Sequence, residues 1–117
     1  MFNPYNLTTY KQAKELTSII YKLLKNFPKD ERYCIVSQLK RAVLSIGANI
    51  AEGCGRNSKA ETLHFFNIAL GSLFEVKYFL ETSRNLNYLT EEDFSTVFPL
   101  ATSLSKQLTT LIKSLRP

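Results

Sequence analysis

The sequence LKRAVLSIGANIAEGCGR, residues Leu39–Arg56, contains the pattern that decides the fold. Its large apolar side chains recur at steps of three and four residues, which is the spacing of one helix face. These positions are Leu39, Ala42, Val43, Ile46 and Ile50. A second flank carries the small residues Ser45, Gly47, Ala48 and Ala51. Small side chains let a neighbouring helix approach closely, so the stretch predicts the second half of a long helix packed in a bundle.

Three further segments have helical periodicity, and short connections separate them. We expect helices over about residues 8–26, 31–52, 59–85 and 91–115. The last segment places apolar residues at alternating steps of four and three, which is typical of a left-handed bundle seam. These are Val97, Ala101, Leu104, Leu108, Leu111 and Leu115. Pro99 predicts either a kink in this helix or a true start near Phe98. Four helices with short loops predict an all-α, antiparallel up-down-up-down, left-handed four-helix bundle.

Capping residues mark the expected helix ends. Asp30 is the predicted N-cap of the second helix, and Gly53 its predicted left-handed C-cap. Ser58 and Glu61 form a capping box before the third helix, and Thr90 precedes three acidic residues before the fourth. The first helix is expected to start near Asn6 or Thr8.

The 117 residues are enough for one domain, 1–117, in which residues 1–7 form an N-terminal arm. The formal net charge is +5, and all of this excess lies in the first half. Residues 1–57 carry nine Lys/Arg and four Asp/Glu, whereas residues 58–117 carry six of each. A basic half indicates a face that contacts nucleic acid, an acidic protein or a membrane surface.

The candidate nucleic-acid-binding residues are seven of the nine cations of this half together with the first lysine of the third helix. They are Lys11, Lys14, Lys22, Lys25, Lys40, Arg41, Arg56 and Lys59. Tyrosines are interleaved with them at Tyr10, Tyr21 and Tyr33, which gives contact with nucleic acid some weight beside the alternative of a solvated surface. No signature of a sequence-reading module is present.

The two cysteines, Cys34 and Cys54, are far apart and have no CxxC partner. We expect free buried thiols in a reducing cytoplasm. The sequence shows no signal peptide, and no apolar stretch is long enough to span a membrane.

The sequence predicts no catalytic residue, metal site or cofactor. The glycine-rich corner Gly53–Lys59 resembles a phosphate cradle, but a helix precedes it, and a cap–turn–cap corner is the preferred interpretation. His64 is the only histidine, and Glu61–His64 is the only Glu-x-x-His motif. A di-iron bundle needs two such motifs. We therefore expect His64 on the surface or between subunits.

Two carboxylates stand in apolar surroundings, at Glu52 and Glu75. Each needs a cation or amide partner, and Arg41 and Asn49 are the natural ones. We interpret the set as a buried structural network rather than as acid–base chemistry. The third helix is apolar over more than one face, which indicates either a central position or a partner subunit.

Two motifs in the sequence resemble one protein family. The first is Gln38–Ala42 with Ser45-Ile46, Asn49–Gly53, Arg56 and Ser58; the second is Phe66, Ala69 and Gly71–Leu73 with Glu75. They are similar to the signature of the S23-type proteins encoded in intervening sequences of bacterial 23S ribosomal RNA genes. By this resemblance Arg41, Asn49, Glu52, Ser72 and Glu75 match the motif, and we interpret them as a structural polar network.

The resemblance implies a left-handed four-helix bundle that assembles as a homopentamer. It also implies kinship with the accessory variability protein of diversity-generating retroelements, a basic pentamer that binds nucleic acid and a reverse transcriptase. The first hypothesis is therefore a non-enzymatic, oligomeric protein that binds RNA or DNA through a basic face. The alternative is a protein–protein adaptor that uses the third helix or the arm residues Phe2 and Tyr5.

Overall fold

The computed structural model describes residues 2–117 and contains four α-helices and two short 3₁₀ helices. In chain order they are η1 (Pro4–Asn6), α1 (Thr8–Leu24), η2 (Lys29–Glu31), α2 (Ile35–Cys54), α3 (Lys59–Asn85) and α4 (Glu91–Leu115). The described residues contain no strand. The predicted arm is partly ordered, because Asn3 caps η1 and the Phe2 ring lies 6.3 Å from that of Phe66. Met1 lies outside the described residues.

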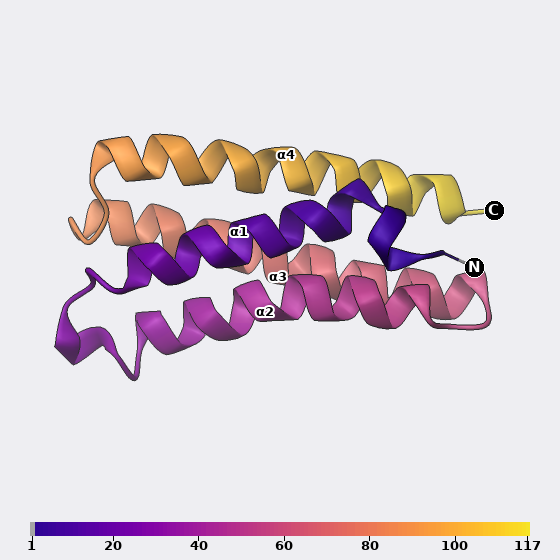
Figure 1. Cartoon of the computed structure of the whole chain (residues 1–117), viewed down its shortest axis with the longest axis horizontal. Coiled ribbons are helices and arrows are strands. Elements are labelled where there is room, and N and C mark those ends of the chain that lie inside the picture. Colours follow the sequence, from indigo (N-terminus) through magenta and orange to yellow (C-terminus); the bar gives the residue numbers. More distant parts are fainter. Residues whose placement is uncertain (1) are drawn as a thin grey trace.

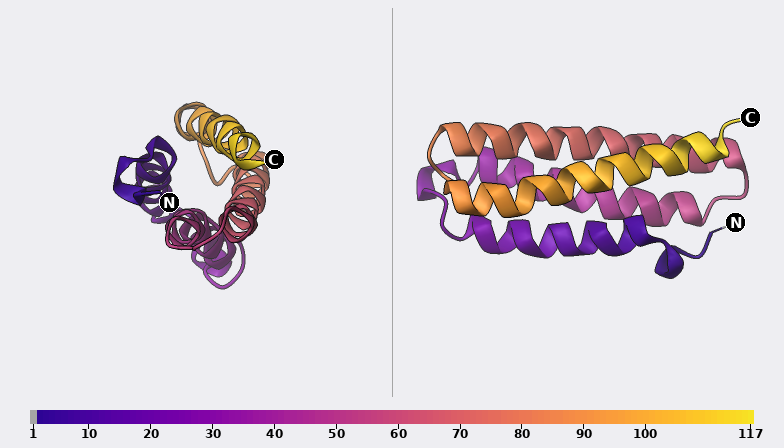
Figure 2. Two further views of the ribbon diagram at one scale, coloured as in Figure 1. Left: turned by 90° about the vertical axis from the view of Figure 1, so that its right-hand side faces the viewer. Right: turned by 90° about the horizontal axis from the view of Figure 1, so that it is seen from above.

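The four α-helices run antiparallel along one axis, and each packs against two neighbours in the order α1, α2, α3, α4 (Figures 1 and 2). The bundle measures 44 × 25 × 21 Å. The α1–α2 and α3–α4 connections lie at one end, and the α2–α3 connection lies at the other end with both chain termini (Figure 1). The predicted all-α antiparallel four-helix bundle is confirmed.

The core consists of the apolar stripes of all four helices. The α2 stripe predicted from the sequence is fully buried, from Leu39 to Ile50. Burying each large aliphatic side chain contributes roughly 1.5–3 kcal/mol, so these stripes are the main source of stability. In α4, Ile112 is 2% exposed, whereas Leu111 is only half-buried. The predicted seam therefore differs at one position, where Ile112 is buried in place of Leu111, and Leu115 is buried as predicted.

Gly53 does not end α2 as predicted. The helix continues to Cys54, Gly55 follows with a φ of −87°, and no described glycine has a positive φ. A Cβ atom on Gly53 would lie 2.8 Å from the buried ring of Phe66. Thr62 of α3 also donates a hydrogen bond to the Gly53 carbonyl at 2.8 Å. Gly53 is therefore required by the close approach of α2 and α3.

The start of α2 was also predicted wrongly. Asp30 lies in η2, and α2 begins at Ile35 after Cys34, without a side-chain cap. The proline at position 28 keeps the chain extended before η2, so the turn takes more residues than the pattern suggests. Cys34 is exposed here, which corrects the expectation of two buried thiols, whereas Cys54 is buried and burial raises the pKa of its thiol.

The remaining helix ends follow local chemistry. Ser58 and Thr90 accept hydrogen bonds from the amides of Glu61 and Asp93 at 3.2 and 3.0 Å, as predicted. The first helix begins after Leu7, which has no side chain able to cap it. Pro99 is exposed and lies inside α4, which begins at Glu91, so the predicted alternative start near Phe98 is wrong.

Candidate nucleic-acid interface

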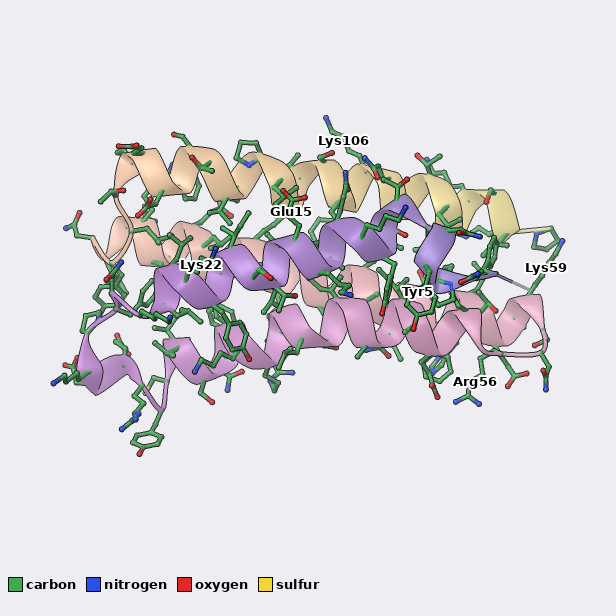
Figure 3. The ribbon with its side chains drawn as sticks, viewed as in Figure 1. Tyr5, Glu15, Lys22, Arg56, Lys59 and Lys106 are labelled. Carbon is green, nitrogen blue, oxygen red and sulfur yellow. The ribbon has the colours of Figure 1, made fainter. Side chains whose placement is uncertain are left out.

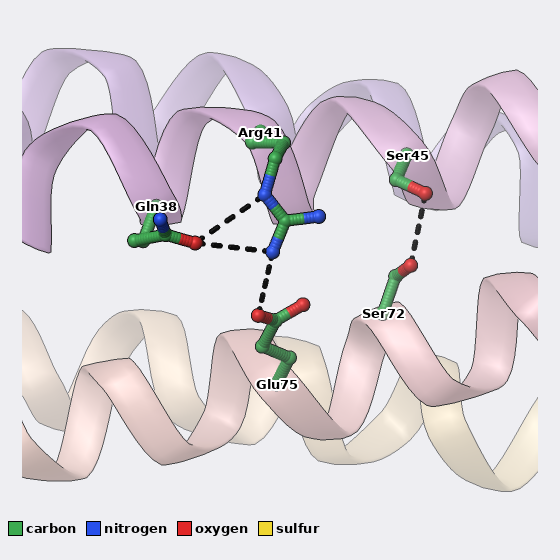
Figure 4. A network of polar contacts seen from close by, with 5 residues as sticks. All are labelled: Gln38, Arg41, Ser45, Ser72 and Glu75. Carbon is green, nitrogen blue, oxygen red and sulfur yellow. Dashed lines mark hydrogen bonds and ion pairs between the residues drawn. The ribbon is translucent and has the colours of Figure 1, made fainter.

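Polar side chains join α2 to α3 along one flank of the bundle (Figure 4). Arg41 donates to Glu75 at 2.7 Å and to Gln38 of its own helix at 3.1 Å. One helical turn further along, Ser72 donates to Ser45 at 2.9 Å. The two contacts join α2 to α3 at successive turns along the surface of the bundle.

The predicted network is divided into separate parts. Asn49 contacts Ser45 at 2.9 Å and so extends the serine pair. Glu52 instead pairs with Arg56 of its own helix. The contacts are also not buried, because the Arg41 side chain is 58% exposed and that of Glu75 35%. The set is therefore a surface seam, and ion pairs at such exposure contribute little stability.

The candidate cations do not lie in one cluster. Figure 3 shows Lys22 toward the end that holds the α1–α2 connection, whereas Arg56 and Lys59 lie toward the opposite end. Arg41 and Arg56 are engaged by carboxylates. The other six, Lys11, Lys14, Lys22, Lys25, Lys40 and Lys59, are exposed and form no ion pair within the described residues.

Tyrosine rings lie beside some of these free lysines. The Lys14 ammonium lies 5.6 Å from the centre of the Tyr10 ring, and that of Lys40 lies 5.3 Å from the centre of the Tyr21 ring. A ring face attracts a cation but leaves its charge uncancelled. The α1–α2 side of the bundle therefore presents ammonium groups that are held in place and still able to bind phosphate.

Two further cations join this surface. Lys29 and Arg32, from the connection between α1 and α2, line a pocket together with Lys25 and Lys40. Charge counting placed both in the basic first half of the sequence, but no sequence pattern brings them beside Lys25 and Lys40. They line the pocket because it lies between the end of α1, the connection and the start of α2.

Of the small-residue flank of α2, Ser45 contacts α3, whereas Gly47, Ala48 and Ala51 lie beside α1 and do not pack as tightly as predicted. A Cβ on Gly47 would lie 3.7 Å from that of Ala13, which is an ordinary contact. Beside it, a hollow of about 430 Å³ is lined by Tyr10, Leu44, Ala48 and neighbouring residues. The closest helix approach is instead on the α3 side, at Gly53.

The glycine-rich corner forms the predicted cap–turn–cap structure. The Ser58 hydroxyl accepts from the Glu61 amide and donates to the Glu61 carboxylate at 3.1 Å, so an acid already occupies the start of α3. His64 is exposed, and its ring lies 5.1 Å from that of Phe65. No group of three or more His, Cys, Asp or Glu within residues 2–117 is arranged to hold a metal ion.

Large apolar side chains are exposed along α3. Ile68, Phe74 and Tyr78 are 39%, 55% and 63% exposed. We call these three residues the outer stripe of α3. The sequence predicted that this helix would be either central or covered by a partner, and in the single chain the outer stripe is uncovered.

A family model describes residues 5–110, which include α1–α3 and most of α4. It is the model of the 23S rRNA-intervening sequence proteins. The chain belongs to the 23S rRNA-intervening sequence protein family. The resemblance found in the two sequence motifs is therefore confirmed, and it extends through most of the chain.

A solved structure from the same group is similar to this member of the family. It is the crystal structure of a protein with unknown function from the S23 ribosomal protein family of Bacteroides thetaiotaomicron. The two chains share 29% identity with a TM-score of 0.85, and the match covers 91% of this chain and 99% of that one. No curated protein matches the chain. None of the described helices is both long and apolar enough to cross a bilayer.

Proposed function

We propose that this family member is a non-enzymatic, oligomeric protein that binds RNA or DNA through the α1–α2 side of the bundle. The observation that carries the proposal is the set of exposed cations on this side that no carboxylate neutralises. Arg41 and Arg56 form the only two ion pairs within the described residues, which leaves the lysines of α1 and Lys40 free. We expect the protein in the cytoplasm, where nucleic acid is available.

Phosphate contact through lysine is independent of sequence. Each phosphate that a lysine neutralises releases counterions, so affinity falls steeply as salt rises. The exposed lysines and arginines here lie on helices and a turn, and no described element resembles a module that reads base edges. We therefore expect binding that is sensitive to salt and tolerant of sequence.

Self-association would multiply the charge. One chain has a net charge of +5, which is modest for a protein that binds nucleic acid alone. Several copies that align their α1–α2 sides would bind one polyanion through many contacts. The outer stripe of α3 supports self-association, because exposed aromatic side chains are typical of protein interfaces. A homopentamer is the assembly that the family resemblance implies.

The test uses charge reversal on α1 with a matched control on α4. Lys14→Glu with Lys22→Glu is expected to weaken binding of a structured RNA at least tenfold at low salt. Removing two phosphate contacts should also reduce the salt slope by about 2. Lys106→Glu with Lys113→Glu makes the same change in net charge on α4 and is expected to have a smaller effect. Equal losses in both variants would mean that only net charge matters, and absence of RNA and DNA binding at low salt would refute the proposal.

The second candidate is a protein–protein adaptor, which the exposure of Phe74 and Tyr78 favours. In that case Phe74→Ser with Tyr78→Ser would abolish partner binding without changing the mass of the assembly in solution. If the outer stripe instead mediates self-association, light scattering will show that the same variant has a lower mass. The two outcomes separate the adaptor from the oligomeric nucleic-acid-binding protein.

A further inference from the structure

A pocket of about 480 Å³ lies between the end of α1, the connection after it and the start of α2. Its volume is within the range of small-molecule sites, about 300–1,000 Å³. Residues from all three segments line it: Leu24, Lys25, Phe27, Pro28, Lys29, Arg32, Val36 and Lys40. The lining combines four cations with an apolar floor and contains no acidic residue.

The cations of this pocket are free to bind an anion. None of Lys25, Lys29, Arg32 and Lys40 takes part in the ion pairs found among residues 2–117. Val36 lies in the first turn of α2, whose start has no side-chain cap and no acid. The partial positive charge of that helix end adds to the four full charges.

Glu31, a half-buried acid of the same connection, does not line the pocket. Glu31 accepts a hydrogen bond from the Tyr88 hydroxyl at 2.6 Å, across the end of the bundle. This hydrogen bond raises the pKa of Tyr88 to about 12, so the tyrosine stays a neutral donor at physiological pH. Because the Glu31 carboxylate is engaged on the α3–α4 side, the same turn presents Lys29 and Arg32 to the pocket without a neutralising partner.

The floor of the pocket is firm and apolar. Leu24 and Phe27 are 6% and 8% exposed, and the Phe27 ring packs 5.6 Å from that of Tyr88. The guanidinium of Arg32, which lines the pocket, lies 5.8 Å from the ring of the next residue, Tyr33, which is 85% exposed. An exposed aromatic ring and a planar guanidinium are the two surfaces on which unpaired bases stack.

We propose that this pocket binds a nucleotide, with its phosphate among the four cations and its base against the apolar floor and the Arg32 guanidinium. An inorganic anion would use the charges and leave the apolar floor without a partner. A duplex would offer phosphate and keep its bases stacked inside. The ligand is therefore a single nucleotide, either free or at an unpaired end of a bound nucleic acid. Binding of an unpaired end of nucleic acid rests on the proposed function, whereas binding of a free nucleotide does not.

The first experiment measures binding of adenosine 5′-monophosphate, adenosine and inorganic phosphate to the full chain by calorimetry. We expect the nucleotide to bind about fivefold to a hundredfold more tightly than phosphate, which is the contribution of one stacked base. Lys29→Glu with Arg32→Glu is expected to reduce nucleotide affinity at least tenfold. The control pair Lys106→Glu with Lys113→Glu changes the net charge by the same amount. It should leave the nucleotide affinity within about threefold, because α4 does not line the pocket and salt screens distant charges. All four side chains are exposed, and a thermal unfolding curve of each variant verifies the fold.

The second experiment compares a blunt RNA hairpin with the same hairpin carrying a short unpaired 3′ extension. A preference for the extension that disappears in the Lys29→Glu, Arg32→Glu variant assigns the pocket to an unpaired nucleotide of bound RNA. Nucleotide binding without that preference assigns it to a free nucleotide, and it does so even if RNA does not bind at all. The inference is overturned if the mononucleotide binds no more tightly than phosphate. Salt-sensitive RNA binding would then still support the proposed function.

Discussion

Helix α2 has two flanks of different character, one packed against α3 and the other against α1. On the α3 flank the backbones approach so closely that Gly53 faces the ring of Phe66, and Arg41 and Ser45 find polar partners on α3. On the α1 flank Gly47 has only an ordinary neighbour, and a hollow lies beside it. The cation of this second flank, Lys40, meets a tyrosine ring instead of an acid.

The two flanks therefore differ in their cations: the cation on the α3 flank is paired with an acid, and the cation on the α1 flank is not. Arg41 and Lys40 are adjacent in the sequence, so their side chains point about 100° apart around the helix. One therefore joins the seam with α3, and the other lines the basic pocket. Two adjacent residues of the same charge thus have different expected roles. Substitutions on the two flanks should therefore have different consequences.

The largest expected effect comes from adding one methyl group to each glycine of α2. Gly53→Ala should destabilise the protein by about 1–3 kcal/mol, because its Cβ would overlap the buried Phe66 ring. Gly47→Ala is expected to be neutral or stabilising by up to about 1 kcal/mol, because alanine favours the helix and the nearest atom is 3.7 Å away. Urea unfolding of the two variants measures both changes.

Gly71→Ala on α3 is a further control, since nothing lies within 4 Å of its Cβ position. It should resemble Gly47→Ala. If all three substitutions destabilise the protein equally, the contrast in packing between the two flanks is wrong.

A smaller effect is expected from the ion pair across the α2–α3 seam. A double-mutant cycle with Arg41→Met and Glu75→Gln should give a coupling free energy of about 0.2–1 kcal/mol, because both groups are partly exposed. The coupling should decrease as salt rises. On the other flank, Lys40→Met is expected to lower the affinity for a nucleotide. Its effect on the free energy of unfolding should be smaller than its effect on the free energy of binding. A coupling near zero would mean that the ion pair adds nothing to the stability of the α2–α3 contact.

The smallest expected effect concerns the hydrogen bond that Tyr88 donates to Glu31. The pKa of Tyr88 is raised to about 12 from 10 by its hydrogen bond to Glu31. The folded state therefore favours the neutral phenol, so the bond stabilises the fold fully below about pH 10 and is lost as pH rises toward about 12. Unfolding midpoints of wild type and Tyr88→Phe, measured from neutral pH upward, should differ at first and then converge within that window. A constant difference would show that the bond does not act through the phenol proton.

Much of the fold was predictable because it depends on local periodicity. The stripe from Leu39 to Ile50 is buried as its spacing indicates, and Ser58 and Thr90 cap their helices through contacts that span only three residues. The start of α2 was not predictable in this way. Asp30 has cap chemistry, but it lies in the 3₁₀ helix that follows Pro28, and Glu31 beside it bonds to the distant Tyr88.

The candidate interface was predictable only in part. Charge counting located the basic half of the sequence, and the lysines of α1 are indeed exposed. Counting could not show that Arg56 is engaged by Glu52 or that Lys59 lies at the opposite end from Lys22. It also could not gather Lys25, Lys29, Arg32 and Lys40 around one pocket, since they come from two helices and a turn.

By itself the sequence determined the fold class, the family and the basic sign of one half, because periodicity, motifs and charge are properties of residues in order. Tertiary structure alone decided which cations are neutralised and which remain free, because an ion pair such as Arg41–Glu75 depends on distance between helices. It also decided the role of Gly53. That glycine was predicted to end a helix, and the structure requires it because Phe66, from the next helix, leaves no room for a side chain.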